Sequence, residues 1–165
     1  MKMFKRFAAA LLVGVMALAM LTACGKEAIV RDTEQEKTAI TLTQNAAKTV
    51  QINLKEDETA TGIAATGLPA AVDMYNAAMK KDREALVAAA KDLVTTVNDK
   101  LLAAGKKGVI IYDVVPGKLT AENLKDKFDA LKNAQLPAGF TPAKVGAAVT
   151  KKGDYTVFVI VVTNE

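Results

Sequence analysis

Few side chains in this sequence could do chemistry, and the residue types most used in catalysis are missing. The 165 residues include no histidine and a single cysteine, Cys24, and the chain contains no serine. Without histidine there is no Ser-His-Asp triad, no Cys-His pair and no histidine-ligated zinc or haem. The sequence also has no GxGxxG, P-loop or EF-hand motif, so we predict no cofactor.

Asp113 is the main candidate for carboxylate chemistry. It lies in the β-rich run 109–115, where alternation places it on the same side as Val109 and Ile111. A carboxylate buried there would favour its protonated form and could act as a general acid or base. In the alternative interpretation, Asp113 marks the point at which the strand leaves the core.

Aromatic, acidic and basic residues give further candidates for binding. Tyr75, Tyr112 and Tyr155 combine a ring with a polar tip, which suits either a ligand cleft or packing at the rim of the core. The acidic run 56–58 lacks the tight turn that a calcium site needs, so we predict no metal site. Three basic clusters suit either anionic headgroups or solvated element ends: Lys80, Lys81 and Arg83; Lys106 and Lys107; Lys151 and Lys152.

Cys24 follows an N-terminal segment of recognisable design. Three basic residues precede an uncharged stretch at 8–21, which is shorter than the roughly 20 residues that span a bilayer. The stretch ends in Leu21-Thr22-Ala23-Cys24, which resembles the lipobox of bacterial lipoproteins. The resemblance implies that residues 1–23 are a signal peptide, that Cys24 carries diacylglycerol, and that the protein is anchored at the extracytoplasmic face of the cell membrane. An ordinary secretory signal and an uncut membrane anchor are the alternatives.

Removal of residues 1–23 changes the charge of the chain. The whole chain has a net charge of +4 and a pI near 9.1. Loss of Lys2, Lys5 and Arg6 leaves 19 basic and 18 acidic residues, a balance that gives no reason to expect nucleic-acid binding. The remaining length suits one domain, and a lipidated Cys24 leaves no thiol for an internal disulfide.

The region after Cys24 is predicted to be a tether followed by strands. Residues 24–38 are polar and charged, which favours a flexible tether, although residues 28–30 could instead add an edge strand. Period-two alternation predicts a hairpin of strands at 40–43 and 49–54. Small and polar residues predict a loop over 55–67.

Helical patterns follow in the middle of the chain. Leu68-Pro69 is predicted to open a helix, because proline suits the first turn. Asp82 is placed to cap a second helix, with an apolar stripe over 86–102 and Gly105 at its end. Thr120 is placed to cap a third helix, which carries Leu124, Phe128 and Leu131 on one face.

The C-terminal pattern predicts a hairpin with strands at 144–150 and 155–162. The second strand is apolar on both faces, so we expect it to be central and covered on both sides. The order β-β-α-α-β-α-β-β predicts one α+β domain at 39–165. Its antiparallel-rich sheet would pack with helices, and a three-layer α/β/α sandwich fits this order.

The closing hairpin carries a second resemblance. Residues 145–149 and 153–157 look like the closing hairpin of CAP-superfamily domains, the secreted cysteine-rich and pathogenesis-related proteins. The resemblance covers about 20 residues and implies an α/β/α sandwich. The cavity of that family uses paired histidines and glutamates. Because this chain has no histidine, the resemblance implies a degenerate site without metal activity.

These observations leave three hypotheses for the function. The first is a lipid-anchored extracytoplasmic domain that binds a protein, the cell wall or a small ligand without converting it. The second is a histidine-free hydrolase that uses carboxylates such as Asp113. The third is a passive structural lipoprotein. No motif in the sequence names the ligand or the oligomeric state.

Overall fold

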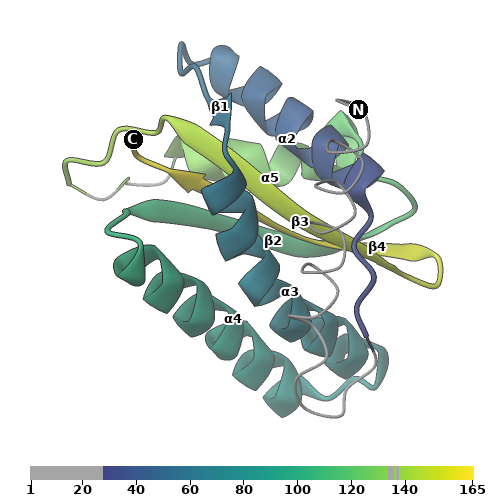
Figure 1. Cartoon of the computed structure of the whole chain (residues 1–165). Coiled ribbons are helices and arrows are strands. Elements are labelled where there is room, and N and C mark those ends of the chain that lie inside the picture. Colours follow the sequence, from purple (N-terminus) through teal and green to yellow (C-terminus); the bar gives the residue numbers. More distant parts are fainter. Residues whose placement is uncertain (1–27, 134–135, 137) are drawn as a thin grey trace, which may run out of the picture. The chain divides into compact units, whose positions relative to one another are not determined.

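The computed structural model describes residues 28–133, 136 and 138–165. Residues Arg31–Glu165 form one compact unit, separate from Met1–Val30, and Figure 1 shows its sheet and helices. The signal segment and Cys24 lie outside the described residues, so the lipobox stays a prediction. No helix in the described part of the chain is both long and apolar enough to cross a bilayer.

The described part of the chain contains four helices and four strands. The sheet order is β1-β3-β4-β2, in which β1 runs parallel to β3 and the other two pairings are antiparallel. The elements are α2 (Thr33–Lys48), β1 (Lys55–Glu56), α3 (Glu58–Met79), α4 (Arg83–Ala103), β2 (Gly108–Pro116), α5 (Ala121–Asn133), β3 (Lys144–Lys152) and β4 (Tyr155–Thr163).

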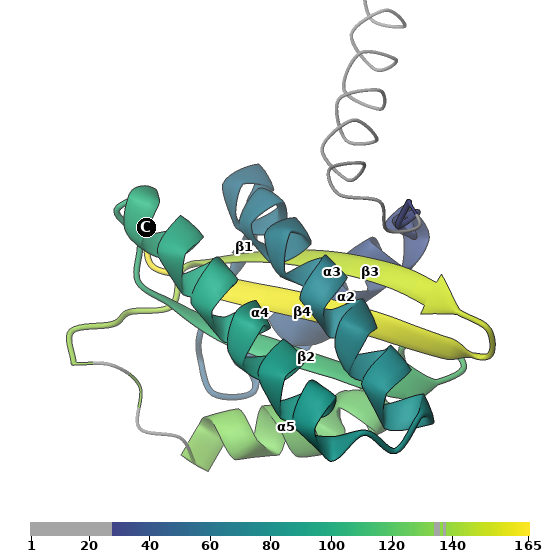
Figure 2. The ribbon, with the colours of Figure 1, turned by 90° about the horizontal axis from the view of Figure 1, so that it is seen from below.

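The elements form three layers. Helices α3 and α4 cover one face of the sheet, and α2 and α5 cover the other (Figures 1 and 2). Phe158 of β4 belongs to the core cluster beneath α2 and α5, whereas Val159 lies against α3 near Gly67. Both predictions for this strand are confirmed: β4 is central, and it is covered on both faces. The α+β fold with a three-layer sandwich is also confirmed, with one short parallel pairing added.

Helix α3 lies unusually close to β3. A Cβ atom on Gly146 would lie 2.0 Å from the backbone nitrogen of Thr61. Only glycine leaves room for a backbone at this distance. The close approach lets the small side chains of α3, such as Ala60 and Ala64, bury themselves against the sheet.

The predicted hairpin at 40–43 and 49–54 is wrong, because residues 33–48 form helix α2. The side chains that α2 buries recur at spacings of three and four residues: Gln35, Glu36, Ala39, Ile40 and Thr43. The Asp32 side chain caps the helix by accepting from the backbone N–H of Gln35. Burial on the sheet thus outweighs the short alternating pattern of Ile and Thr residues, whose preference for strands depends strongly on context.

The predicted loop at 55–67 is also wrong. Residues 55–56 form β1, and α3 begins at Glu58, where the Asp57 side chain accepts from the N–H of Ala60 at 2.8 Å. Pro69 lies inside this helix and not in its first turn. Thr and Gly are poor helix formers, but tertiary burial of Ile63, Gly67 and Leu68 compensates for them.

The tether is shorter than predicted. Arg31 forms an antiparallel bridge with Thr150, and α2 begins at Thr33, so residues 31–38 belong to the domain. No strand is assigned to residues 28–30. The polar composition of 31–38 misled the prediction because its charged side chains make specific buried contacts.

The predicted ends of α4, the start of α5 and the closing hairpin are confirmed, whereas the predicted place of the Leu131 side chain lies outside what the structure describes. Asp82 caps α4 by accepting from Ala85. Gly105 ends α4 with a φ of 66°. Thr120 and Asn123 exchange side-chain bonds with each other's backbone N–H at the start of α5. Strands β3 and β4 form the predicted hairpin around Gly153. In each case the local pattern agrees with the tertiary environment.

Candidate functional site

An apolar pocket with a volume of about 260 Å³ opens between the layer of α2 and α5 and the sheet. It lies at the end of the sheet where β2 and β3 begin and β4 ends. Six separate segments contribute to it. The lining residues are Thr43, Ala46, Ala47, Val50, Ile52, Leu54, Val109, Phe128, Leu136, Phe140, Pro142 and Val162.

One wall of the pocket is made by the end of α2 and the turn that follows it. The N–H of Gln51 donates to the carbonyl of Lys48 and the N–H of Ile52 to that of Ala47. This Schellman arrangement requires the left-handed φ of 61° that Gln51 adopts. The amide of Gln44 then donates to the carbonyl of Leu54 at 3.1 Å, which holds the returning chain against the helix.

The opposite wall is the segment that leads into β3. The ammonium group of Lys107 donates to the carbonyl of Ala138 at 3.2 Å. The N–H of Ala143 donates to the carbonyl of Thr163 at 2.8 Å. Between these two points Phe140 is buried in the core cluster. Val109 and Val162, which pair across β2 and β4, form the floor.

The pocket suits binding by apolar contact and offers no group for acid-base catalysis. Among its lining side chains, only Thr43 is polar, and the Thr43 hydroxyl donates to the carbonyl of Ala39 at 2.7 Å. An apolar cavity of about 150 Å³ is sufficient to bind benzene. This pocket is larger, so an apolar group of at least that size fits it.

Asp113 does not lie in a buried site. Its side chain is 38% exposed and pairs with Lys127 of α5 at 2.6 Å, and it also accepts from the N–H of Val114. Asp113 therefore shares the α5 side of the sheet with Ile111, as alternation predicted. The burial on which the acid-base hypothesis depended is absent.

The tyrosines do not gather around the pocket either. Tyr75 and Tyr155 pack against each other with ring centroids 5.7 Å apart, which joins α3 to the start of β4. Tyr112 is half-buried and pairs in register with Val159. None of the three tyrosines, nor Asp113, is among the residues that line the pocket.

Within the acidic run at 56–58, Asp57 has a structural role. Its side chain caps α3 and pairs with Lys144 at 3.5 Å. Within residues 28–133, 136 and 138–165, no three His, Cys, Asp or Glu side chains come together in a group that could hold a metal.

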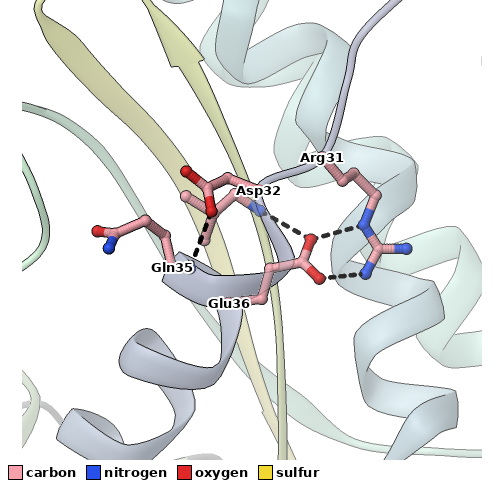
Figure 3. Close-up of polar contacts among 5 residues, drawn as sticks. Arg31, Asp32, Gln35 and Glu36 are labelled. Carbon is pink, nitrogen blue, oxygen red and sulfur yellow. Dashed lines mark hydrogen bonds and ion pairs between the residues drawn. The ribbon is translucent and has the colours of Figure 1, made fainter.

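A cluster of polar and charged side chains joins the start of α2 to β3, and we call it the clasp: Arg31, Asp32, Gln35 and Glu36 (Figure 3). Arg31 donates to both carboxylate oxygens of Glu36, at 2.6 and 2.8 Å. Glu36 also accepts from the N–H of Val149 at 3.2 Å. Gln35 accepts from the N–H of Leu119 at 2.8 Å, which ties α2 to the connection before α5.

The clasp is built for stability rather than catalysis. Glu36 and Gln35 are buried, and the Glu36 carboxylate already has three donors. A bidentate Arg-carboxylate pair with a further N–H is a strong and geometrically specific arrangement. The sequence prediction missed it because its tether interpretation treated these charges as solvated.

Comparison of the chain with known protein families, curated proteins and solved structures gave no match. Sequence reasoning missed the pocket because it placed Ile52 and Leu54 in a strand. Phe140, a large apolar residue in an irregular segment, was the available indication that something apolar is covered there.

Proposed function

We propose that this protein is a lipid-anchored extracytoplasmic domain that binds an apolar group of a small ligand or protein partner and does not convert it. The observation that carries the proposal is the pocket whose lining has one polar side chain, Thr43. Specific ligand pockets are concave, largely apolar and few in one protein. The lipobox-like run ending at Cys24 supplies the anchor.

Two alternatives have less support. A carboxylate hydrolase would need a proton donor or acceptor in a site that excludes water, whereas Asp113 is ion-paired and partly exposed. A degenerate CAP-like domain draws support from the three-layer sandwich and from the hairpin of β3 and β4. Such a domain would have no metal activity here, since the chain has no histidine, and so it is compatible with a binding function.

The pocket is tested by blocking it. Ala47 lines the pocket, and Ala47→Phe would fill much of it with a ring. We expect octanoate, whose carboxylate can remain in water at the opening, to bind the unmodified protein. In the Ala47→Phe variant its affinity should fall by about tenfold or more, the equivalent of about 1.4 kcal/mol. Isothermal titration calorimetry measures both values.

The matched control is Ala88→Phe, which adds the same ring to an exposed position on α4. Its affinity for octanoate should equal that of the unmodified protein. Equal affinity in all three proteins would mean that the probe binds elsewhere, and the pocket would lose its role.

The anchor is tested separately. Mass spectrometry of the mature N-terminal peptide should find Cys24 as the first residue, with a diacylglyceryl group on its sulfur. Cys24→Ala should abolish fatty-acid labelling, because the chain has no other thiol. A free thiol at Cys24, or cleavage at another position, would contradict the lipid anchor and the localisation that depends on it.

A further inference from the structure

Lys107 lies beside the apolar pocket, immediately before β2. The N–H of Lys107 donates to the side-chain oxygen of Asn164 at 2.9 Å, and the N–H of Asn164 donates to the carbonyl of Lys107 at 3.2 Å. These bonds continue the pairing of β2 with β4 beyond Gly108 and Thr163. Because side chains alternate along a paired strand, the Lys107 side chain lies on the same side of the sheet as Val109, in the floor of the pocket.

The ammonium group of Lys107 reaches the wall of the pocket that leads into β3. It donates to the carbonyl of Ala138 at 3.2 Å, and it lies 4.0 Å from the position that a Cβ atom on Gly139 would occupy. Leu136 and Phe140, on either side of these two residues, both line the pocket. Leu136 is exposed, so this part of the wall borders the opening. The ammonium group therefore lies at the margin of the pocket, on a side chain that is itself exposed to water.

The positive charge of Lys107 is accessible to a ligand. The ammonium group has three hydrogens, and the bond to Ala138 uses one of them. In the part of the chain that the structure describes, no ion pair involves Lys107. Asp57 and Glu165, at the same end of the sheet, pair with Lys144 instead. An anion at the opening of the pocket can therefore accept from Lys107 without displacing a carboxylate of the described residues.

The lining of the pocket determines the rest of the ligand. Its one polar side chain, Thr43, already donates to the carbonyl of Ala39. A polar group inside the pocket would lose its hydrogen bonds to water without replacement. The ligand is therefore apolar along the part that enters the pocket, and any charge that it carries stays at the opening beside Lys107.

We propose that the pocket binds a fatty acid, whose acyl chain fills the apolar lining and whose carboxylate pairs with Lys107 at the opening. The assignment rests on the proposed function, since it names the class of ligand for the same pocket. Both charges lie in contact with water, and such ion pairs change an equilibrium by only about two- to fivefold. The acyl chain supplies most of the affinity, and Lys107 selects anionic amphiphiles over uncharged and cationic ones of equal length.

Charge reversal at Lys107 tests the pairing. Isothermal titration calorimetry of the full-length protein compares three probes with eight carbons each: octanoate, octanol and octylammonium. In Lys107→Glu, the affinity for octanoate should fall about fivefold and that for octylammonium should rise about fivefold, because attraction and repulsion exchange places. High salt should reduce both changes. The affinity for octanol should stay the same, which also shows that the pocket of the variant is intact.

Lys106→Glu is the matched control, because it makes the same change of net charge one residue away. The N–H of Lys106 donates to the carbonyl of Leu101, so Lys106 belongs to the end of α4 and not to the wall of the pocket. Its affinity for octanoate should change by less than about twofold. The milder variant Lys107→Gln should lower octanoate affinity by about two- to threefold, and it provides the test if the charge reversal prevents folding.

Three results would overturn the fatty-acid assignment. These are unchanged octanoate affinity in both Lys107 variants, equal losses of octanoate and octanol affinity, and equal losses of octanoate affinity in Lys107→Glu and Lys106→Glu. Ala47→Phe separates the two proposals. If it weakens octanoate and octanol while the Lys107 variants leave octanoate unchanged, the pocket stands without the ion pair. If it weakens neither probe, the pocket loses its role and the fatty-acid assignment fails with it.

Discussion

At the hairpin end of the sheet, the Glu36 carboxylate accepts hydrogen bonds from Arg31 and from the backbone of Val149 while it is buried. At the other end, the lining of the pocket contains one polar side chain, Thr43, whose hydroxyl is satisfied by its own helix. Helix α2 connects the two regions, since its first turn contributes the clasp and its last turn lines the pocket.

The contrast separates stability from binding. A buried ion pair with directed hydrogen bonds has one favourable geometry. Removing one partner leaves the other charge buried without a partner. An apolar pocket tolerates changes of shape, and the free energy of binding depends on the contacts that its lining makes with the ligand. We therefore expect substitutions in the clasp to lower stability and leave ligand affinity unchanged, and substitutions in the pocket to do the reverse.

The largest effect is expected for Glu36→Ala. The change leaves the Arg31 guanidinium and the N–H of Val149 without their partner in a largely buried position. Unfolding in urea should show a loss of about 3 kcal/mol, with octanoate affinity unchanged wherever the protein is folded. Lys125→Ala is the control, because it breaks an exposed pair with Asp129 and should cost less than about 0.5 kcal/mol. Equal losses in the two variants would contradict the role of the clasp.

A smaller effect is expected for Gln51→Gly, at the turn beside the pocket. Gln51 adopts a φ of 61°, which costs a residue with a Cβ about 1 kcal/mol and costs glycine little. Thermal unfolding should show a gain of about 0.5–1 kcal/mol, and Gln51→Ala should show none. A loss of stability in the glycine variant would mean that the side chain, and not the backbone, maintains this turn.

The smallest change in stability is expected for Thr43→Val. The substitution keeps the shape of the side chain and removes the hydroxyl that donates to Ala39. The carbonyl of Ala39 remains free to accept within the helix, so stability should change by less than about 0.5 kcal/mol. Octanoate affinity should rise about two- to fivefold, because the lining becomes wholly apolar. A fall in affinity would show that the hydroxyl contacts the ligand.

The elements that could be predicted from the sequence are those in which the local residue pattern favours the same structure as the surroundings in the fold. Asp82, Gly105 and Thr120 act at helix ends through backbone groups only a few residues away, so their roles could be read locally. The central strand β4 was recognisable because apolar side chains on both faces require cover on both faces. These positions are enough to give the order of elements from α4 to the C-terminus.

The first half of the domain could not be read in the same way. Helix α2 contains β-branched residues such as Ile40 and Thr43, and it depends on burial and on the clasp. Helix α3 depends on Gly146, about 80 residues away in the sequence, which allows its close approach to β3. The pocket combines side chains from six segments, so no local spacing could indicate it.

Methyl NMR of the labelled protein during titration with octanoate tests the central claim most directly. Binding in the pocket should shift the methyl signals of Leu54, Val109 and Val162 in proportion to occupancy. The signals of Val114 and Val157, which lie towards the hairpin turn on the other face of the sheet, should not move. Shifts centred on Val114 and Val157, or no shifts at any methyl group, would contradict the account of an anchored domain that binds an apolar group at the end of the sheet opposite the hairpin turn.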